Sequence, residues 1–423
     1  MSMYKKSILK NGLRVITSNM PHMESVAIGL WIGVGSRYET KKLSGISHLI
    51  EHMLFKGTRK RSADNLKEAI EGVGGTFNAF TGEEETCYLV KLPSKHLELG
   101  LDVLSDMVLN PKLSRNELEK EKYVICEEIK MYIDHPGHHV FDILTKTMWP
   151  KEALGRSIAG CIESVKSFKR EDLTAFMKQY YQPANTVIVA TGRIDSGKCI
   201  NFAKNTFSMN STKRFPCKLT GKIKKTKQFE FFHKKTQQSH IAFGFYGLKR
   251  TDSRIYALAL LHIILGGNMS SRLFDRLREK KALCYEISSG IKKYKETGAF
   301  IIHAGIANDK ISIATEEVLS ELREIKKNFV TGDELCRAKE YATGQLLLAL
   351  EDTASRMIWL GEKIVLEEGA SSIRELLKKL KKVTKEEVRD VANVIFNNKN
   401  LNFATIGPAT EKIKNNLKKA LII

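Results

Sequence analysis

The chain has 423 residues, 42% of them hydrophobic, and a formal net charge of +21. This length exceeds that of one ordinary domain, and no run approaches the roughly 18 consecutive apolar residues of a membrane span, so we expect more than one core and no membrane partner. The seven cysteines are scattered without CxxC pairs, which predicts reduced thiols. No secretory signal is visible at the N-terminus, so we expect a cytoplasmic location, with the mitochondrial matrix as the alternative.

The excess of positive charge raises the question of nucleic-acid binding. The lysines and arginines are dispersed along the chain, and Leu376–Lys382 is typical of a helix with a solvated, lysine-rich face. No RNA- or DNA-binding motif accompanies them. The sequence therefore predicts no nucleic-acid partner, and a salt-dependent shift on DNA would contradict this prediction.

The first chemically informative element is a helix predicted over Ser44–Phe55. It carries His48 and His52, four residues apart, with Glu51 just before the second histidine. On an α-helix, residues four apart project about 40° from each other, so both imidazoles share one face. The opposite face is apolar and should pack into a core, through Ile46, Leu49, Ile50 and Met53.

This HxxEH order is the reverse of the commoner HExxH motif of zinc proteases. Two neutral imidazoles on one face can bind one zinc ion, and the adjacent carboxylate can act as general base toward a zinc-bound water. The alternative is a helix with two solvated or core-bonded histidines. A catalytic zinc site also needs a third protein ligand, because three side chains and a water usually complete it.

A strand is predicted next, over Gly74–Leu89, because β-forming and aromatic residues follow a Gly-Gly pair. It contains the acidic run Glu83–Glu85. Such runs are usually solvated loops, although this one could attract basic peptides.

The best candidate for the third ligand lies in a helix predicted over Arg115–Ile133, where apolar residues recur with helical spacing. Glu121 and Glu128 are seven residues apart, so they project within about 20° of each other, and both fall inside the apolar arc. A buried carboxylate should be paired or metal-bound, because removing it from water is costly. We therefore expect Glu128 to bind the metal and Glu121 to support the site. The alternative is that both are solvated helix charges.

This helix is followed by His135-Pro-Gly-His138-His139. The density of histidines suggests metal binding, but the Pro-Gly pair is typical of a turn. We expect a turn here and not a second metal site.

The two halves of the chain look related. Ser25–Trp31, followed by the HxxEH helix, parallels Ser239–Phe245, followed by a helix near Arg254–Leu265. The second half has no HxxEH motif, so it should be a non-catalytic partner domain.

Residues 213–228, between the two halves, are basic and poor in aliphatic side chains, as in a linker. We therefore predict an α+β fold with two related domains, residues 1–212 and residues 229–423. Each should hold a mostly antiparallel sheet with helices packed on one side.

Five segments form a wider pattern around the HxxEH motif: HLIEHMLFKGT (His48–Thr58), GGTFNAFTGEEETCYL (Gly74–Leu89), EKEKYVICEEIKMYIDHP (Glu119–Pro136), YYQPANTVIVATGRID (Tyr180–Asp195) and GGNMSSRLFDRLREKKALCY (Gly266–Tyr285). With these segments the chain resembles the M16 (inverzincin) metallopeptidases, the family of pitrilysin, insulin-degrading enzyme and the mitochondrial processing peptidase. The likeness covers nearly the whole chain. It is greatest to the short bacterial M16B proteases and to the processing peptidase β subunit.

The resemblance implies one Zn²⁺ per chain, held by His48, His52 and Glu128. It implies that Glu51 is the general base and that Glu121 supports the zinc ligands. No zinc residue departs from the family pattern, which argues against an inactive relative.

The resemblance also implies two sets of residues that meet the substrate. Asn78, Ala79 and Phe80 would lie on a sheet edge that binds an extended peptide through main-chain hydrogen bonds. Arg278 and Tyr285, from the second half, would hold the substrate and the developing oxyanion. These two side chains would share a helical face if their helix ran on.

The implied function is a zinc-dependent endopeptidase that hydrolyses unfolded or short peptides, held extended in a closed chamber. The implied assembly is a homodimer, or a heterodimer with an inactive paralogue. The rival hypothesis is a non-catalytic assembly subunit of the same family. Such relatives generally lose zinc residues, whereas all four are present here.

Overall fold

The computed structural model describes residues 4–208, 225, 227–366 and 372–423. Most of the expected linker, residues 213–228, therefore lies outside the described residues. The chain divides into two compact units, and each is built around one sheet.

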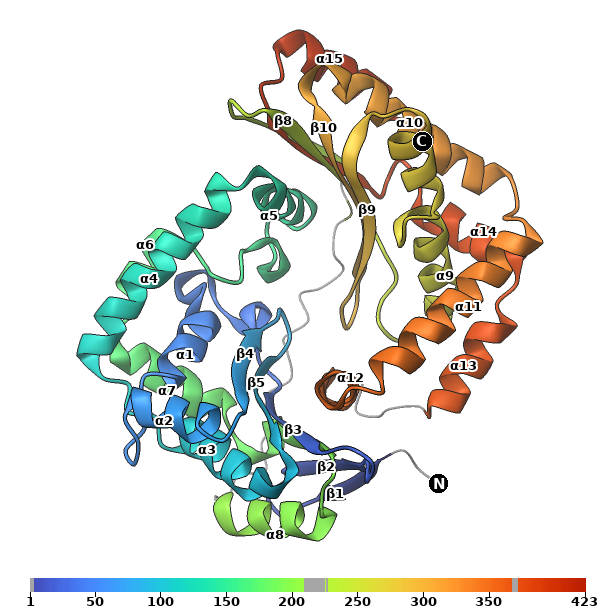
Figure 1. The fold of residues 1–423 in the computed structure, drawn as a ribbon. Coiled ribbons are helices and arrows are strands. Elements are labelled where there is room, and N and C mark those ends of the chain that lie inside the picture. The colour runs from blue at the N-terminus through green and yellow to red at the C-terminus, as the bar shows by residue number, and fades with distance from the viewer. Residues whose placement is uncertain (1–3, 209–224, 226, 367–371) are drawn as a thin grey trace. The chain divides into compact units, whose positions relative to one another are not determined.

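The sheet of the first unit has six strands in the spatial order β1 (Lys5–Ile8), β2 (Arg14–Asn19), β6 (Thr186–Gly192), β3 (Ser25–Ile32), β5 (Thr86–Pro93) and β4 (Thr76–Thr81). Neighbouring strands are antiparallel, except that β2 and β6 run parallel. Helices of the N-terminal half bury one face of this sheet (Figure 1): α1 (Ile46–Leu54), α2 (Ala63–Glu71), α3 (Leu97–Leu109), α4 (Arg115–Asp134), α6 (Ile162–Ser167), α7 (Arg170–Tyr180) and α8 (Ser196–Thr206).

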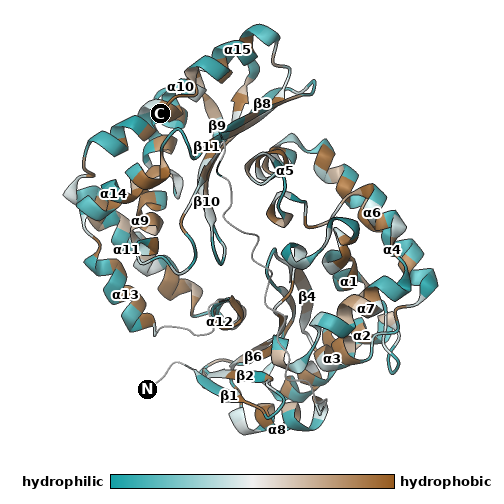
Figure 2. Cartoon of the chain, turned by 180° about the vertical axis from the view of Figure 1, so that it is seen from behind, coloured by the Kyte–Doolittle hydropathy of each residue, from teal (hydrophilic) through white to brown (hydrophobic). Residues whose placement is uncertain are grey.

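The sheet of the second unit has five strands in the order β7 (Gln228–His233), β11 (Leu401–Gly407), β8 (Gln238–Tyr246), β10 (Gly298–Ala307) and β9 (Cys284–Lys293). Only the β7–β11 pair is parallel. Its core face is covered by α9 (Ile255–Gly266), α10 (Ile311–Lys327), α11 (Gly332–Ala349), α13 (Ile373–Lys382), α14 (Lys385–Ile395) and α15 (Glu411–Ala420). Figure 2 shows α9 coloured as hydrophobic, as its sequence IYALALLHIILG requires.

The opposite face of each sheet is covered by a helix from the other half of the chain. In the first unit, α12 (Thr353–Leu366) packs Met357, Leu360 and Ile364 on the side of the sheet that carries Trp31. In the second unit, α5 (Pro136–Met148) packs on the side of the sheet that carries Ala242. The expected α+β fold class, with one sheet in each of two units, is confirmed. The helices do not pack on one side only, as expected, because α12 and α5 cover the opposite faces of the two sheets.

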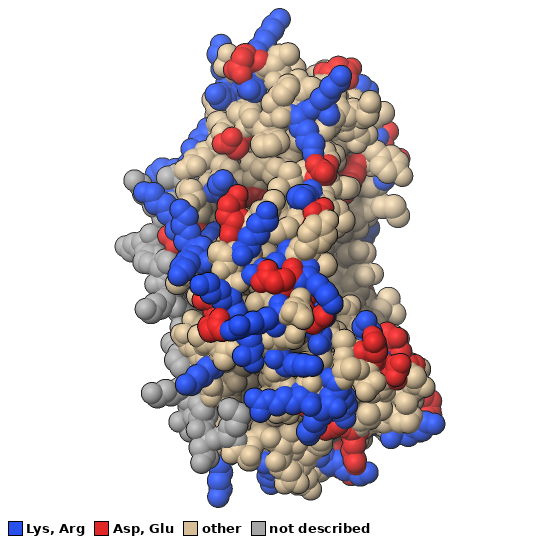
Figure 3. Space-filling model, turned by 90° about the vertical axis from the view of Figure 1, so that its left-hand side faces the viewer, with Lys and Arg blue, Asp and Glu red and all other residues tan. Residues whose placement is uncertain are grey.

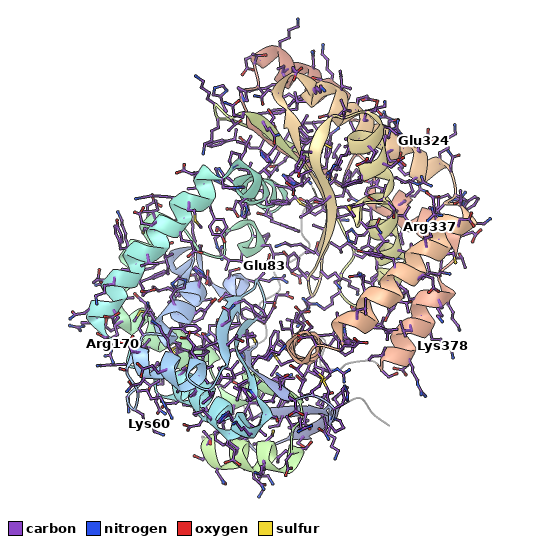
Figure 4. The ribbon with its side chains drawn as sticks, in the orientation of Figure 1. Lys60, Glu83, Arg170, Glu324, Arg337 and Lys378 are labelled. Carbon is purple, nitrogen blue, oxygen red and sulfur yellow. The ribbon has the colours of Figure 1, made fainter. Side chains whose placement is uncertain are left out.

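Two local predictions were wrong. The segment Gly74–Leu89 is not one strand but the hairpin of β4 and β5, in which Gly82 N–H donates to Glu85 O at 2.8 Å. Glu83, labelled in Figure 4, lies in its turn. The neighbouring Glu84 is buried and ion-paired with Arg37, so the acidic run is not simply a solvated loop.

The predicted turn at His135-Pro-Gly-His138-His139 is instead the start of α5. Pro136 is the first residue of this helix, and His135 precedes it in an extended conformation. Proline is favoured at the first helical position, because the N–H that it lacks would have no helical partner there. The Pro-Gly pair therefore opens the helix.

The basic residues do not form a single block on the face drawn in Figure 3, where acidic side chains stand among them. Among the described residues, no helix combines the length and the apolar composition that crossing a bilayer would require.

We predict that Gly361 is needed for α12 to pack closely against Trp31 of the first sheet. A Cβ atom at this position would lie 2.1 Å from Cε2 of the fully buried Trp31, which has no space to move away. The variant Gly361→Ala should therefore lose about 1–3 kcal/mol of stability through overpacking, seen as a lower midpoint of thermal unfolding.

The matched control is Gly344→Ala, at a helical glycine of α11 where an added Cβ meets nothing within 4 Å. This variant should gain about 0.5–1 kcal/mol, because alanine has the higher helix propensity. Equal midpoints for the two variants would show that α12 does not pack on Trp31 in this way.

Candidate metal centre

The buried carboxylate of Glu39 caps the N-terminus of α1 and so fixes where this helix begins. The backbone N–H groups of Gly45 and Ser47 donate to Glu39 at 2.8 and 2.9 Å, which satisfies two N–H groups that the helix leaves unpaired. Gly45 has a φ of +94°, and a Cβ there would lie 2.6 Å from Ala159 O. The predicted helix over Ser44–Phe55 is confirmed as α1, Ile46–Leu54.

The apolar face of α1 is buried as expected, through Ile46, Leu49, Ile50 and Met53. This orientation turns His48, Glu51 and His52 away from the core, and their side chains therefore remain partly exposed.

The helix α4 supplies the carboxylates. Leu118, Ile125 and Ile129 anchor it to the core, and the same helical periodicity turns Glu121 and Glu128 toward α1. The exposed fraction of the Glu121 side chain is only 6%, whereas that of Glu128 is 26%. The prediction that both glutamates lie on the buried side of this helix therefore agrees with the structure.

Three ligand atoms converge between α1 and α4. Glu128 Oε2 lies 3.9 Å from His48 Nε2 and 3.8 Å from His52 Nε2. Among the described residues, His48, His52 and Glu128 are the group whose ligand atoms all lie within 4.8 Å of one another. Ligands of a tetrahedral zinc ion are about 3.4 Å apart, so shifts of a few tenths of an ångström would let these three residues hold one.

The protonation state of His48 suits metal binding. Burial, and then the nearby His52, lowers the pKa of His48 to about 4. The imidazole is therefore neutral near pH 7 and keeps the lone pair that a metal ion requires.

Glu121 fixes the ring of His52 from the side opposite the ligand atoms. Its Oε2 accepts a hydrogen bond from His52 Nδ1 at 3.0 Å, and its Oε1 pairs with Lys56 Nζ at 2.7 Å. Burial alone would raise the pKa of Glu121, but these two hydrogen bonds outweigh burial and lower it. An ionised Glu121 holds the proton on His52 Nδ1, which leaves Nε2 as the free ligand atom.

Glu51 lies beside the ligands in a different environment. Burial is the main reason that its pKa is raised, with the charge of Glu128 adding to the shift, while the hydrogen bond from Thr81 and the nearby His52 act in the opposite direction. The Thr81 hydroxyl donates to Glu51 Oε2. A carboxylate with a raised pKa, held next to a metal site, is suited to accept and return a proton.

Sequence reasoning missed Thr81 and Lys56. Lys56 follows His52 by four residues, which is one helical turn and could have suggested a partner for the site. Thr81 had no such signal, because it reaches α1 only through the register of the β4–β5 hairpin.

The strand β4 brings Asn78, Ala79 and Phe80 close to this centre. It is an edge strand of its sheet and contacts α1, and its inner side pairs with β5. Within the described chain no strand pairs with the outer side of β4. Asn78 is exposed, and its Oδ1 accepts the backbone N–H of Ala79 at 2.8 Å.

Arg278 and Tyr285 belong to the second unit. The expected common helix does not run on: a π-helical segment, Phe274–Lys280, contains Arg278, whereas Tyr285 lies on β9. The two side chains still meet, since the guanidinium of Arg278 lies 4.9 Å from the ring centroid of Tyr285, whose exposed fraction is 76%. Their part at the metal centre stays a prediction.

Two models of known protein families match consecutive parts of this chain. Residues 14–161 match the model of the insulinase family, peptidase family M16, and residues 167–341 match that of the M16 inactive domain. The HxxEH motif and Glu128 fall within the first match.

Similar proteins match over nearly the full length. The chain is 38% identical to a Bacillus subtilis protein named as the uncharacterized zinc protease YmxG, over 93% of this chain and 96% of that protein. It is 33% identical to the uncharacterized zinc protease SCO5738 of Streptomyces coelicolor, over 99% of this chain and 92% of that protein.

Solved structures share the fold at lower sequence identity. A protease from Helicobacter pylori superposes with a TM-score of 0.91 at 22% identity, over 96% of this chain and 100% of that one. A peptidase M16 inactive domain from Pseudomonas fluorescens gives 0.89 at 20% identity, over 96% and 98%. The family models and the full-length likeness to zinc proteases show that this chain belongs to peptidase family M16.

Proposed function

We propose that the protein is a zinc-dependent endopeptidase that cleaves unfolded or short peptides. The observation that carries the proposal is the convergence of His48 Nε2, His52 Nε2 and Glu128 Oε2, with the Glu51 carboxylate beside them. The names of the similar proteins support it, because they are called zinc proteases.

Each residue of the proposed site has its own role in peptide hydrolysis. A zinc ion held by His48, His52 and Glu128 would polarise a peptide carbonyl and make a water molecule more acidic. Glu51 would take the proton of that water and later deliver it to the leaving amine. Thr81 occupies Glu51 Oε2, which leaves Oε1 as the proton acceptor.

The edge of β4 is the proposed place for the substrate. An extended peptide can add to an open sheet edge by main-chain hydrogen bonds, which tolerate many sequences. Asn78, Ala79 and Phe80 would lie along it. A folded domain cannot offer such a strand, so the substrate class is unfolded or short peptides.

The proposed assembly is a homodimer that encloses a chamber, in which Arg278 and Tyr285 donate hydrogen bonds to the substrate and to the oxyanion. A heterodimer with an inactive paralogue is the variant of this proposal. The second candidate, a non-catalytic assembly subunit, is opposed by the presence of Glu51 next to a complete ligand set.

The direct test is digestion of an unstructured peptide by the purified chain, read by mass spectrometry. We expect cleavage that stops with a chelator and returns with added Zn²⁺. Glu51→Gln should lose at least about a hundredfold in kcat, because the proton acceptor is gone, while its zinc content stays equal to that of the intact chain.

The control for this variant is Glu68→Gln, at an exposed glutamate of α2, which should keep full activity. Cleavage that survives the chelator, or a fully active Glu51→Gln, would contradict the proposal. No cleavage by the intact chain would favour the assembly subunit.

Glu121→Gln should weaken zinc binding by about 10–100-fold, because the amide holds the proton on His52 Nδ1 less strongly than a carboxylate does. The dissociation constant can be measured by competition with a chromophoric chelator. Glu119→Gln is the matched control, since this glutamate lies on the same helix and pairs with Lys122 instead. If both variants bound zinc as tightly as the intact chain, Glu121 would have no part in the site.

Thr81→Val should lower kcat by about tenfold or more with little change in KM, because a hydrogen bond to a charged group contributes about 1.5–3 kcal/mol. Thr81→Ser keeps the hydroxyl and should restore most of the activity. Zinc content should be equal in both variants. A rise in KM alone would mean that Thr81 serves substrate binding and does not position Glu51.

A further inference from the structure

A second group of histidines lines a pocket of about 350 Å³ in the second unit. The lining residues come from the strands β8, β9 and β10, from α5 with His135 just before it, and from the last turn of α4. They lie far along the chain from the HxxEH motif. Four of its lining side chains are imidazoles and two are carboxylates: His135, His138, Asp142, His240, Glu286 and His303.

The sheet contributes one side of this pocket through its register. Gly305 of β10 pairs with His240 of β8 on one side and with Glu286 of β9 on the other. Residues directly opposite each other in an antiparallel sheet point to the same face, as do residues two apart on one strand. His240, Glu286 and His303 therefore project together, on the face that α5 covers.

Two glycines make room for the ring of His240. A Cβ at Gly305 would lie 3.3 Å from His240 Cε1, and a Cβ at Gly137 would lie 3.2 Å from the same atom and 3.3 Å from Nδ1. The His240 ring therefore lies between Gly305 of β10 and Gly137 of α5, where a larger residue on either side would crowd it.

The start of α5 contributes the other side. His135 and His138 are one turn apart, with ring centroids separated by 4.4 Å, and Asp142 follows His138 by four residues. His138 and Asp142 therefore share one face of α5, and His135, which precedes the helix, lies with its ring beside that of His138. The histidines at the mouth are exposed, whereas His303, on the sheet, is only 4% exposed.

We propose that this pocket is a second site for a divalent transition-metal ion, with zinc as the expected occupant. His240 Nδ1 and His303 Nε2 are hydrogen-bonded to each other at 3.2 Å. A zinc ion would replace the proton that they share, and their separation is close to the distance of about 3.3 Å between two nitrogen ligands of a tetrahedral zinc ion. Imidazole is a preferred ligand of zinc, copper and nickel.

His303 also has a carboxylate near its Nδ1, at a longer distance than the 3.0 Å hydrogen bond between His52 and Glu121. Glu286 Oε1 lies 3.9 Å from His303 Nδ1, on the ring nitrogen that does not face His240. The negative charge of Glu286 favours a proton on Nδ1 of His303, so Nε2 keeps its lone pair, which accepts the hydrogen bond from His240 Nδ1 and would turn to a metal ion in its place.

The third ligand must come from His138 or His135. No third ligand atom of this pocket lies within 4.8 Å of both His240 Nδ1 and His303 Nε2 in the described structure, so one exposed imidazole has to rotate inward. Ordering a mobile side chain costs conformational entropy. The second site should therefore bind zinc more weakly than the site formed by His48, His52 and Glu128.

The test is a zinc titration of the full, metal-free chain against a chromophoric chelator. We expect two equivalents, one tight and one weaker. The double variant His48→Ala/His52→Ala should retain only the weaker one, and this result does not depend on peptidase activity. Binding of a single equivalent by the intact chain would overturn the proposal.

Variants of the pocket locate the weaker equivalent. In the His48→Ala/His52→Ala background, adding His303→Gln should abolish it. Because His303 is buried and its variant could fold poorly, His138→Ala gives a second route. It replaces an exposed side chain and should weaken binding by about tenfold or more, unless His135 alone supplies the third ligand, in which case His135→Ala has that effect instead.

The control is His233→Ala, at an exposed histidine of β7 outside the pocket, which should not change the titration. All seven cysteines are present in every variant, so a difference between variants cannot arise from thiols. A weaker equivalent that survives both His138→Ala and His135→Ala would place the metal elsewhere and refute the assignment.

Discussion

The metal centre depends on the hydrogen bond between His52 Nδ1 and Glu121 Oε2, which joins α1 to α4 at 3.0 Å. It sets the rotation of one helix against the other, because Glu128 lies seven residues beyond Glu121 and so reaches the same face two turns later. The cost of burying Glu121 is offset by His52 and Lys56, both of which bind its carboxylate. With this contact in place, the three ligand atoms meet without help from any loop.

The parts of the centre that follow from local periodicity were predictable. His48, Glu51 and His52 belong to one helix, and Glu128 was recognisable as a carboxylate on an apolar arc. Thr81 was not, because it approaches Glu51 only after a hairpin has formed, and no local pattern fixes which strand end meets which helix. For the same reason His240 and His303 gave no signal: they are on different strands, and cross-strand register alone brings them together. The amphipathic pattern of a helix shows that one face is buried but not against which sheet, so the exchange of α5 and α12 could not be foreseen.

The two units share one architecture but place their histidines differently. The helix α9 follows β8 as α1 follows β3, yet it is apolar on nearly every side, and none of its residues is exposed. Its one histidine, His262, is bound through Nδ1 to Ser289 Oγ at 2.7 Å. The second unit places its histidines instead on the other face of its sheet, beneath α5, where the packing leaves an open pocket.

Because each sheet is covered by a helix from the other half of the chain, α5 or α12, the first unit cannot complete its fold early in synthesis. During synthesis the N-terminal half leaves the ribosome first and would ordinarily fold as it emerges. Here the face of the first sheet that carries Trp31 stays uncovered until α12, near the end of the chain, has been translated. The unit that bears His48, His52 and Glu128 is thus completed late, after the residues of α12 have been translated. Until then, the fully buried Trp31 and its apolar neighbours on that face have no helix to pack against.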